Sequence, residues 1–215
     1  MLQAAVHSCS ECPLGDKGSC RFKPRRLGSG ARLWAQGEDE VPLLFVKEGV
    51  LGVSASDAGG RELVAGVRGP RSMLGLEGLR GQVARGTVVA LTDAVVCSIT
   101  ATALKAQMSL DETKTLLDFA LDELSQATRD SDLRTGPALS RVARFLLRYG
   151  SLLMPGRRAP FSKRHVAALL DVRPETMSRA LRSLTEAGLI SSARSIQIRD
   201  AVRLEAVSRG DTLPE

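Results

Sequence analysis

The sequence predicts an α+β protein in which an N-terminal antiparallel β-roll of the cupin-like kind is followed by a long helix and then by a module of short helices. Three observations predict this order. Of the 20 glycines, 13 lie between Gly28 and Gly86, where they separate short β-rich runs. Residues 101–135 contain neither glycine nor proline. The whole excess of positive charge falls after residue 135.

The composition is that of a folded globular protein. Of the 215 residues, 43% are hydrophobic and 25% are charged, which is ordinary for globular domains and excludes a disordered chain, a collagen and a membrane bundle. No apolar run approaches the ~20 residues of a membrane-spanning helix. The first residues also lack the basic and apolar regions of an export signal. We therefore expect a cytoplasmic protein with no membrane partner.

The β-roll is predicted over residues 22–100. Short apolar runs alternate there with glycines and an Asp-Ala-Gly-Gly turn, which is typical of antiparallel strands joined by tight turns. The expected strands are residues 43–46, 50–53, 62–65, 87–91 and 94–99. Turn glycines account for the glycine count, so no phosphate-binding loop is needed to explain it.

One long helix is predicted over residues 101–135, about 50 Å at 1.5 Å per residue. Leu110, Leu117 and Leu124 recur one heptad apart, and small or polar residues fill the alternate positions of the same seam: Thr113, Ala120 and Ala127. This pattern predicts a weak coiled coil between two copies of the chain, which makes a homodimer. The alternative is that the three leucines pack on the β-roll.

Residues 136–215 form the third part of the chain. They carry 14 basic and 7 acidic side chains, a net charge of +7, whereas residues 1–135 carry 16 basic and 17 acidic, a net charge of −1. After Gly136 and Pro137, residues 138–149 predict an amphipathic helix closed by Gly150. Such one-sided charge indicates a partner with dense negative charge, most often nucleic acid. The alternative is a solvated basic surface with no partner.

The third part also contains a predicted winged helix-turn-helix. Two short helices are joined by a three-residue turn and followed by a hairpin over residues 190–198, which is the order of elements in that motif. Capping and turn residues mark the boundaries: Ser162 before a helix at 163–170, Asp171 in the turn, Pro174 and Gly188 at the ends of the second helix, and Asp200 before a last helix.

The second of these helices has two faces. Its apolar stripe consists of Met177, Ala180, Leu181 and Leu184. The opposite face begins at the helix N-terminus, the end that enters the major groove of DNA in this motif, and carries Glu175, Ser178, Arg179 and Arg182. Thr176 is a further candidate for DNA contact. Arginine can bond guanine with two hydrogen bonds, glutamate can accept from cytosine, and serine can contact either base. We expect phosphate contacts from Ser162, Lys163 and Arg164. The alternative is a solvated polar helix face.

The order of a β-roll, a long helix and a winged helix-turn-helix resembles the CRP/FNR family of bacterial transcription regulators over nearly the whole chain. The segment from Glu175 to Arg179 is similar to the E-x-x-S-R motif of the FNR branch, whereas CRP-type members have arginine at position 174 and glycine at position 178. The resemblance implies a dimeric regulator, not an enzyme, that binds double-stranded DNA and acts with RNA polymerase. Glu175, Ser178 and Arg179 would then read a TTGAT-like half-site repeated as a palindrome.

Three of the four cysteines lie close together in residues 1–21, at Cys9, Cys12 and Cys20, and the fourth is Cys97. In a reducing compartment this arrangement favours metal or redox chemistry over structural disulfides. The resemblance implies the oxygen-sensing branch of the family, in which four cysteines hold a four-iron four-sulfur (4Fe-4S) cluster. The seven residues between Cys12 and Cys20 are a variant of that branch's spacing.

The resemblance also implies a mechanism. An intact cluster would pin residues 1–21 beside the long helix and favour pairing of the two subunits, and oxygen or nitric oxide would destroy the cluster and release the segment. Repulsion between acidic side chains would then help to separate the paired helices. The acidic residues concerned are Asp111, Glu112, Asp118, Asp122 and Glu123.

Several alternatives stay open for the sensor. Four thiolates can bind zinc, two can form a thiol–disulfide switch, and Cys97 can be a buried apolar residue. In CRP-type members of the family, a Gly-Glu-Leu segment and a following Arg-Ser pair hold cyclic AMP. Residues 75–78 (Gly-Leu-Glu-Gly) and 84–87 (Ala-Arg-Gly-Thr) depart from both patterns, which argues against a cyclic nucleotide. An iron–sulfur electron carrier is the alternative of another class. The only histidines, His7 and His165, fit no catalytic constellation.

Overall fold

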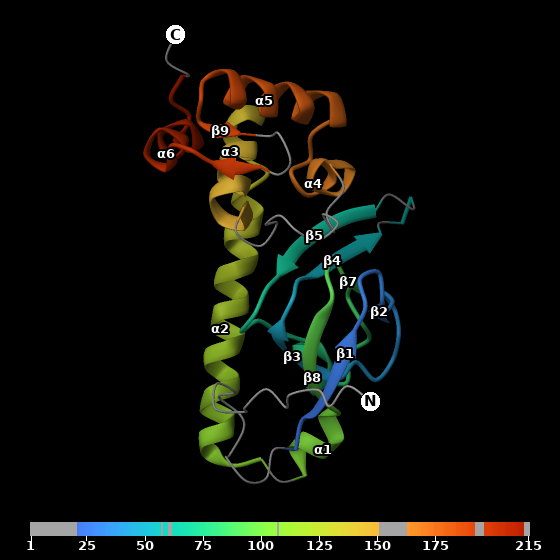
Figure 1. Cartoon of the computed structure of the whole chain (residues 1–215). Helices are drawn as coiled ribbons and strands as arrows, with labels where there is room; N and C mark the ends of the chain where they lie inside the picture. Colours follow the sequence, from blue (N-terminus) through green and yellow to red (C-terminus); the bar gives the residue numbers. More distant parts are fainter. Residues whose placement is uncertain are drawn as a thin grey trace, which may run out of the picture.

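The computed structural model describes residues 21–56, 58–59, 62–106, 108–150, 163–191 and 196–212. Figure 1 shows a β-roll at one end of the molecule, a long helix along its side, and a small module of helices at the other end. The predicted α+β fold is therefore confirmed. No helix in these ranges is long and apolar enough to cross a membrane.

The roll consists of two four-stranded antiparallel sheets, with strand orders β1-β8-β3-β6 and β2-β7-β4-β5. All five predicted runs form strands. The strands are β1 (Lys23–Leu27), β2 (Arg32–Trp34), β3 (Leu43–Glu48), β4 (Leu51–Ser56), β5 (Glu62–Arg68), β6 (Met73–Leu74), β7 (Thr87–Ala90) and β8 (Ala94–Ile99). A 3₁₀ helix, η2 (Leu76–Arg80), follows β6.

The single helix predicted over residues 101–135 is wrong in one respect, because the structure divides it into α1 (Ala101–Lys105) and α2 (Leu110–Asp132). The side chain of Ser109 accepts from the backbone N–H of Glu112, and the Glu112 side chain accepts from the backbone N–H of Ser109. This capping box starts a new helix at residue 110. With 23 residues, α2 is about 35 Å long.

Helix α2 packs on the roll through its apolar side. Leu116 and Phe119 belong to a buried cluster that also contains Phe45 and Cys97 from the sheet. The rings of Phe45 and Phe119 meet edge to face, with centroids 5.6 Å apart and planes at 71°. This geometry is one that aromatic pairs prefer, and it fixes the middle of α2 against β3.

The C-terminal module has the predicted winged helix-turn-helix. Its elements are α3 (Ala138–Tyr149), α4 (Lys163–Leu169), α5 (Pro174–Glu186), β9 (Ile190–Ser191), β10 (Gln197–Ile198) and α6 (Ala201–Arg209), and β9 pairs antiparallel with β10. Asp171 has the expected left-handed conformation, with φ 50°. Pro174 is the first residue of α5, and the Asp200 side chain accepts from the Arg203 N–H. Ser162 lies outside the described residues.

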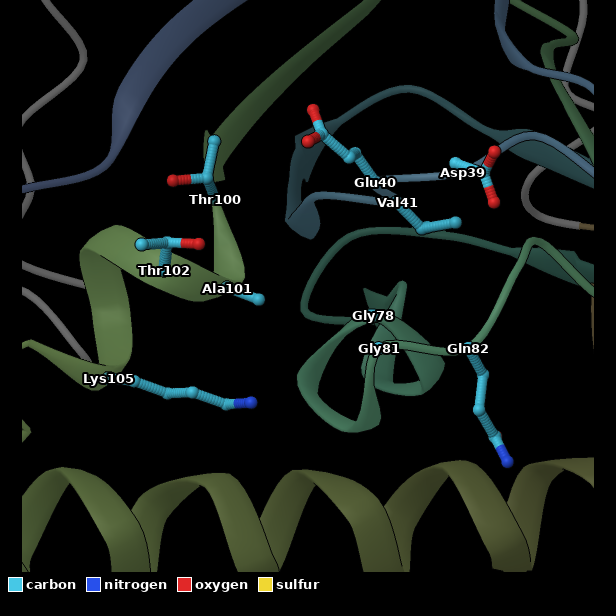
Figure 2. Close-up of a pocket in the computed structure, with 10 residues that line it drawn as sticks. All are labelled: Asp39, Glu40, Val41, Gly78, Gly81, Gln82, Thr100, Ala101, Thr102 and Lys105. Carbon is cyan, nitrogen blue, oxygen red and sulfur yellow. The ribbon is translucent and has the colours of Figure 1, made fainter.

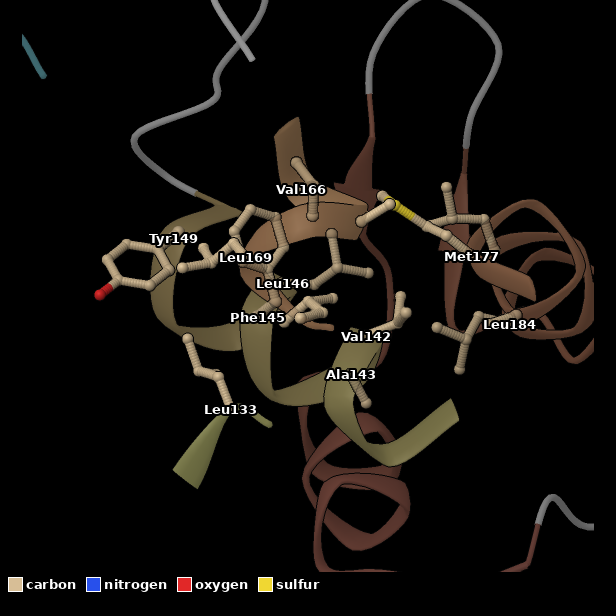
Figure 3. Close-up of a cluster of buried hydrophobic side chains, with 14 of the residues drawn as sticks. Leu133, Val142, Ala143, Phe145, Leu146, Tyr149, Val166, Leu169, Met177 and Leu184 are labelled. Atoms are coloured by element: carbon tan, nitrogen blue, oxygen red, sulfur yellow. The ribbon is translucent and has the colours of Figure 1, made fainter. Parts of the chain in front are cut away.

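The module's core continues into the roll. Figure 3 shows side chains of α3, α4 and α5 turned toward one another, among them Phe145, Val166 and Met177. The same buried cluster includes Val64 and Val67 of β5. The orientation of the module is therefore set partly by contact with the roll.

Candidate nucleic-acid interface and sensor site

The structure gives α5 the two faces that the sequence predicts. Its apolar side chains are buried, namely Met177, Ala180, Leu181 and Leu184, whereas Glu175, Ser178, Arg179 and Arg182 are exposed and Thr176 is half-buried. Figure 1 shows α5 at the end of the module farthest from the roll. The exposed side chains of α5 therefore lie at the outer end of the module.

The proposed phosphate contacts lie only partly within the described residues. The backbone of Lys163 and Arg164 forms the first turn of α4, next to α5 in the motif. Ser162 and the side chains of Lys163 and Arg164 fall outside the description. Their role on the DNA backbone stays a prediction.

Part of the positive charge of the module serves the fold. Arg141 donates to the carbonyl oxygens of Gly136 at 2.7 Å and Leu170 at 3.2 Å. Arg144 donates to the carbonyl oxygen of Ser208 at 2.9 Å. These guanidinium groups satisfy carbonyls at turns and helix ends that have no helical partner. The net charge of +7 thus overstates the charge available to nucleic acid.

The heptad leucines of α2 face away from the roll. Leu110, Leu117 and Leu124 are 72%, 59% and 65% exposed. Leu121, which the heptad reading missed, is also exposed. The alternative that these leucines pack on the roll is therefore wrong, because Leu116 and Phe119 fill that side of the helix. Leu110, Leu117, Leu121 and Leu124 thus form an exposed apolar stripe along α2.

Two of the five acidic residues assigned to the paired-helix seam point elsewhere. Arg21 donates to a carboxylate oxygen of Glu112 at 2.5 Å. Arg68 on β5 contacts Glu123 at 2.8 Å. Both pairs join α2 to the roll side of the molecule, whereas Asp111, Asp118 and Asp122 are exposed.

Of the four candidate metal ligands, the structure describes Cys97. It lies on β8, is 2% exposed, and belongs to a cluster that contains Phe22 and Met73. Pro24 on β1 stands opposite Cys97 in the strand register. Cys9, Cys12 and Cys20 lie outside the described residues, so their approach to Cys97 is untested.

The glycines at the first disrupted cyclic-nucleotide segment have a structural role. A Cβ atom at Gly75 would lie 2.0 Å from the carbonyl oxygen of Pro42, and one at Gly78 would lie 2.0 Å from that of Val41. Both glycines therefore allow η2 to approach the backbone of the preceding loop. Their presence needs no bound phosphate.

A pocket of about 430 Å³ opens next to this segment. Figure 2 shows Asp39 and Glu40 on one side and Lys105 of α1 on another, with Gly78 and Gln82 of the η2 region completing the wall. The lining carries two carboxylates and one ammonium group. That charge does not favour a phosphate-bearing ligand.

These features define a class. A roll joined through a leucine-faced helix to a winged helix-turn-helix is the architecture of a DNA-binding transcription regulator. The model of the cyclic nucleotide-binding domain matches residues 24–111, and that of the Crp-like helix-turn-helix domain matches residues 140–207. The chain belongs to the CRP/FNR family of transcription regulators, whose members are not enzymes.

Relatives come from both branches of the family. The chain is 26% identical over 202 residues to the transcriptional activator protein FnrA of Stutzerimonas stutzeri, covering 86% of this chain and 80% of that protein. It is 28% identical over 199 residues to the cyclic AMP receptor protein of Thermus thermophilus, covering 88% and 89%. These identities do not separate the branches.

Solved structures show the same fold. The structure of FixK2 from Bradyrhizobium japonicum matches with a TM-score of 0.75 and 24% identity, covering 89% of this chain and 99% of that one. A CRP-family transcriptional regulator from Thermus thermophilus matches with a TM-score of 0.75 and 25% identity, covering 88% and 98%.

Proposed function

We propose that this regulator works in the cytoplasm as a homodimer that binds a TTGAT-like palindrome and answers to oxygen or nitric oxide through a 4Fe-4S cluster. The observation that carries the proposal is the exposed Glu175–Ser178–Arg179 face at the N-terminal end of α5. In this face Arg179 bonds guanine, Glu175 accepts from cytosine, and Ser178 contacts a neighbouring base. RNA polymerase is the partner expected at the promoter.

The dimer forms through α2. Pairing two copies along Leu110, Leu117, Leu121 and Leu124 buries the exposed leucines and places the two modules side by side. The recognition helices then lie about one helical turn of DNA apart (~34 Å), as a palindromic site requires. A monomer could grip only one half-site.

The four cysteines support a cluster as the sensor. Cys20 lies two residues before Phe22, and Phe22 packs in the same buried cluster as Cys97. Thiolates from four cysteines would form a donor set suited to an iron–sulfur cluster, namely Cys9, Cys12, Cys20 and Cys97. Oxygen or nitric oxide would destroy such a cluster. The residue after Cys20 is Arg21, which bonds Glu112 in the first turn of α2. Release of the cysteine segment would therefore act on the start of the dimer helix.

The test is purification of the wild type and of Cys97→Ser without oxygen, with iron, sulfide and zinc measured. We expect about four iron and about four sulfide ions per subunit in the wild type, brown colour that bleaches in air, and neither in Cys97→Ser. Ser98→Ala is the matched control because Ser98 is the next residue on β8. A colourless, air-stable protein that carries zinc would replace the cluster with a zinc site, and a metal-free protein with a reversible disulfide would favour a thiol switch.

DNA binding is tested separately on duplexes with a TTGAT palindrome. Affinity should fall steeply as salt rises, because phosphate contacts release counterions. An electron carrier would bind the palindrome no better than a scrambled duplex. Titration with cyclic AMP tests the remaining alternative, and we expect no change in DNA affinity.

A further inference from the structure

A buried charged cluster joins the roll, α2 and α3. Arg68, at the end of β5, is 7% exposed. Its Nε donates to both carboxylate oxygens of Glu123 at 2.8 and 2.9 Å, and its Nη1 donates to Oδ2 of Asp130 at 2.8 Å. One side chain of the roll is therefore held by two carboxylates on α2, almost two turns apart.

Asp130 connects Arg68 to the C-terminal module. Asp130 is 1% exposed, and its other oxygen, Oδ1, accepts from the hydroxyl of Tyr149 on α3 at 2.5 Å. The same hydroxyl accepts from the amide of Gln126 at 2.9 Å. Figure 3 shows that the ring of Tyr149 lies in the apolar cluster while its hydroxyl points out of it.

The surroundings are shaped for this contact. A Cβ atom on Gly66 would lie 2.4 Å from Oδ2 of Asp130 and 2.5 Å from Nη1 of Arg68, so only glycine allows the approach. Arg148 lies 3.5 Å from Oδ1 of Asp130 and stacks over Tyr149, 5.2 Å from the ring centre. Two cationic and two anionic groups thus balance, which buried charges require.

Apolar contacts alone do not fix an angle between two domains. Val64 and Val67 of β5 share a cluster with the module, but apolar burial is non-directional. Hydrogen bonds weaken steeply when donor and acceptor are misaligned. The Arg68–Asp130–Tyr149 chain therefore restricts the orientations that the apolar contact would allow, together with Arg134, which donates to the carbonyl oxygens of Val64 on β5 and Leu169 on α4.

We propose that Arg68, Asp130 and Tyr149 are positioning residues that fix the orientation of the winged helix-turn-helix and thereby set which half-site spacing the dimer accepts. None of the three contacts DNA in this arrangement. The inference rests on the proposed dimeric binding, because spacing has meaning only for two half-sites. Each added base pair moves a half-site by about 3.4 Å along the duplex and rotates it around the axis.

The test compares wild type with Tyr149→Phe on sites that the wild type selects from a pool of random duplexes. From each selected palindrome, a series is made by adding or removing single base pairs between the half-sites, and one duplex keeps a single half-site. For the wild type we expect about tenfold loss of affinity for a one-base-pair change. For Tyr149→Phe we expect about tenfold lower affinity at the best spacing, less than about threefold dependence on spacing, and an unchanged half-site affinity.

Two further variants keep the outcome interpretable. Asp130→Asn retains the shape of the side chain but loses its charge, and should flatten the spacing preference in the same way. Ile99→Val weakens the roll core, where Ile99 is buried, and should lower the melting temperature without changing spacing preference. Folding of every variant is checked by the fluorescence of Trp34, the only tryptophan.

The outcomes distinguish failure of the positioning role from failure of the proposed DNA binding. If the selected sites are palindromes and Tyr149→Phe keeps the wild-type spacing preference, the positioning role is wrong while the proposed DNA-binding function stands. If the selected sites are single half-sites, dimeric binding fails, and with it the positioning role in spacing. If Tyr149→Phe and Asp130→Asn both lose the preference for one half-site spacing while Ile99→Val keeps it, the positioning role is supported.

Discussion

Arg21 and Glu112 form a 2.5 Å hydrogen-bonded ion pair although they are 91 residues apart in sequence. The other carboxylate oxygen of Glu112 accepts from the Ser109 backbone N–H at 2.8 Å. Arg21 also donates to the carbonyl oxygen of Ala103 in α1 at 3.2 Å. The residue that follows Cys20 therefore bridges the end of α1 and the beginning of α2.

Glu112→Ala should weaken this junction. It removes the capping box and the partner of Arg21, so we expect the free energy of unfolding to fall by about 1 kcal/mol at neutral pH. The pKa of Glu112 is lowered, chiefly by the hydrogen bond from the Ser109 backbone and further by Arg21. Its stabilising effect is present above the pKa of an unfolded glutamate, about 4.3, and is lost as pH falls through the lower pKa of the folded state.

Urea unfolding followed by Trp34 fluorescence measures this effect. The difference between wild type and Glu112→Ala should shrink in acid. Asp111→Ala is the matched control, because Asp111 is also in the first turn of α2 but its exposed side chain lies 3.7 Å from Lys114. An equal loss in both variants would contradict the junction role of Glu112.

Leu117→Glu should give a folded monomer. The side chain is 59% exposed in the single chain, so its replacement costs the fold little, whereas a carboxylate in an apolar helix pair is strongly unfavourable. Light scattering should report half the wild-type mass, and affinity for a palindrome should fall to that for one half-site. Arg129→Glu, which reverses an exposed charge of α2 away from the leucine stripe, should remain dimeric. A dimeric Leu117→Glu would rule out this face as the subunit contact.

Arg179→Ala should relax sequence preference without loss of stability. Arg179 is exposed, and a bidentate contact to guanine contributes about 1–3 kcal/mol of discrimination. We expect binding to the best site to weaken by that amount while the melting temperature stays unchanged. Arg144→Ala is the contrasting variant, since Arg144 donates to the carbonyl oxygens of Ser208 and Thr135 and should lose stability first. Unaltered base preference in Arg179→Ala would contradict the readout role.

The sequence predicts well those strands that appear as continuous runs of apolar residues. The apolar runs at 43–46 and 94–99 mark central strands because both of their faces meet hydrophobic layers. Strand β1 escapes detection because it lies at a sheet edge, and its Lys23, Arg25 and Arg26 are exposed. Charged edge strands protect a sheet from association, and their composition hides them from a search for apolar residues.

What the sequence does not reveal depends on partners far along the chain. Glycine and proline content alone made residues 101–135 one helix, although Ser109 and Glu112 show the capping box once it is sought. Arg68 offers no such signal, because its partners Glu123 and Asp130 lie 55 and 62 residues away. The sequence of the helix alone likewise places Glu123 at the contact between two subunits. In the structure Glu123 instead pairs with Arg68 of β5.

Tyr149 should ionise only at unusually high pH. Burial raises its pKa, and so do hydrogen-bond donation to Asp130 and the negative charge of that carboxylate. An unfolded tyrosine ionises at about pH 10. Because the folded pKa is higher, the stabilisation that comes from the neutral hydroxyl is complete below about pH 10 and is lost as pH rises from there toward the folded pKa.

The chain has a single tyrosine, so tyrosinate absorbance reports this one group. In urea-unfolded protein the tyrosinate absorbance should appear at about pH 10. In native protein it should appear only when the pH is well above 10. At neutral pH Tyr149→Phe should lower the free energy of unfolding by roughly 1.5–3 kcal/mol, the range for a hydrogen bond to a charged group. That difference should diminish above about pH 10. If Tyr149 in the native protein titrates as it does in the unfolded chain, its hydroxyl does not donate to Asp130. The hydrogen-bonded chain from Arg68 of β5 through Asp130 of α2 would then not reach α3.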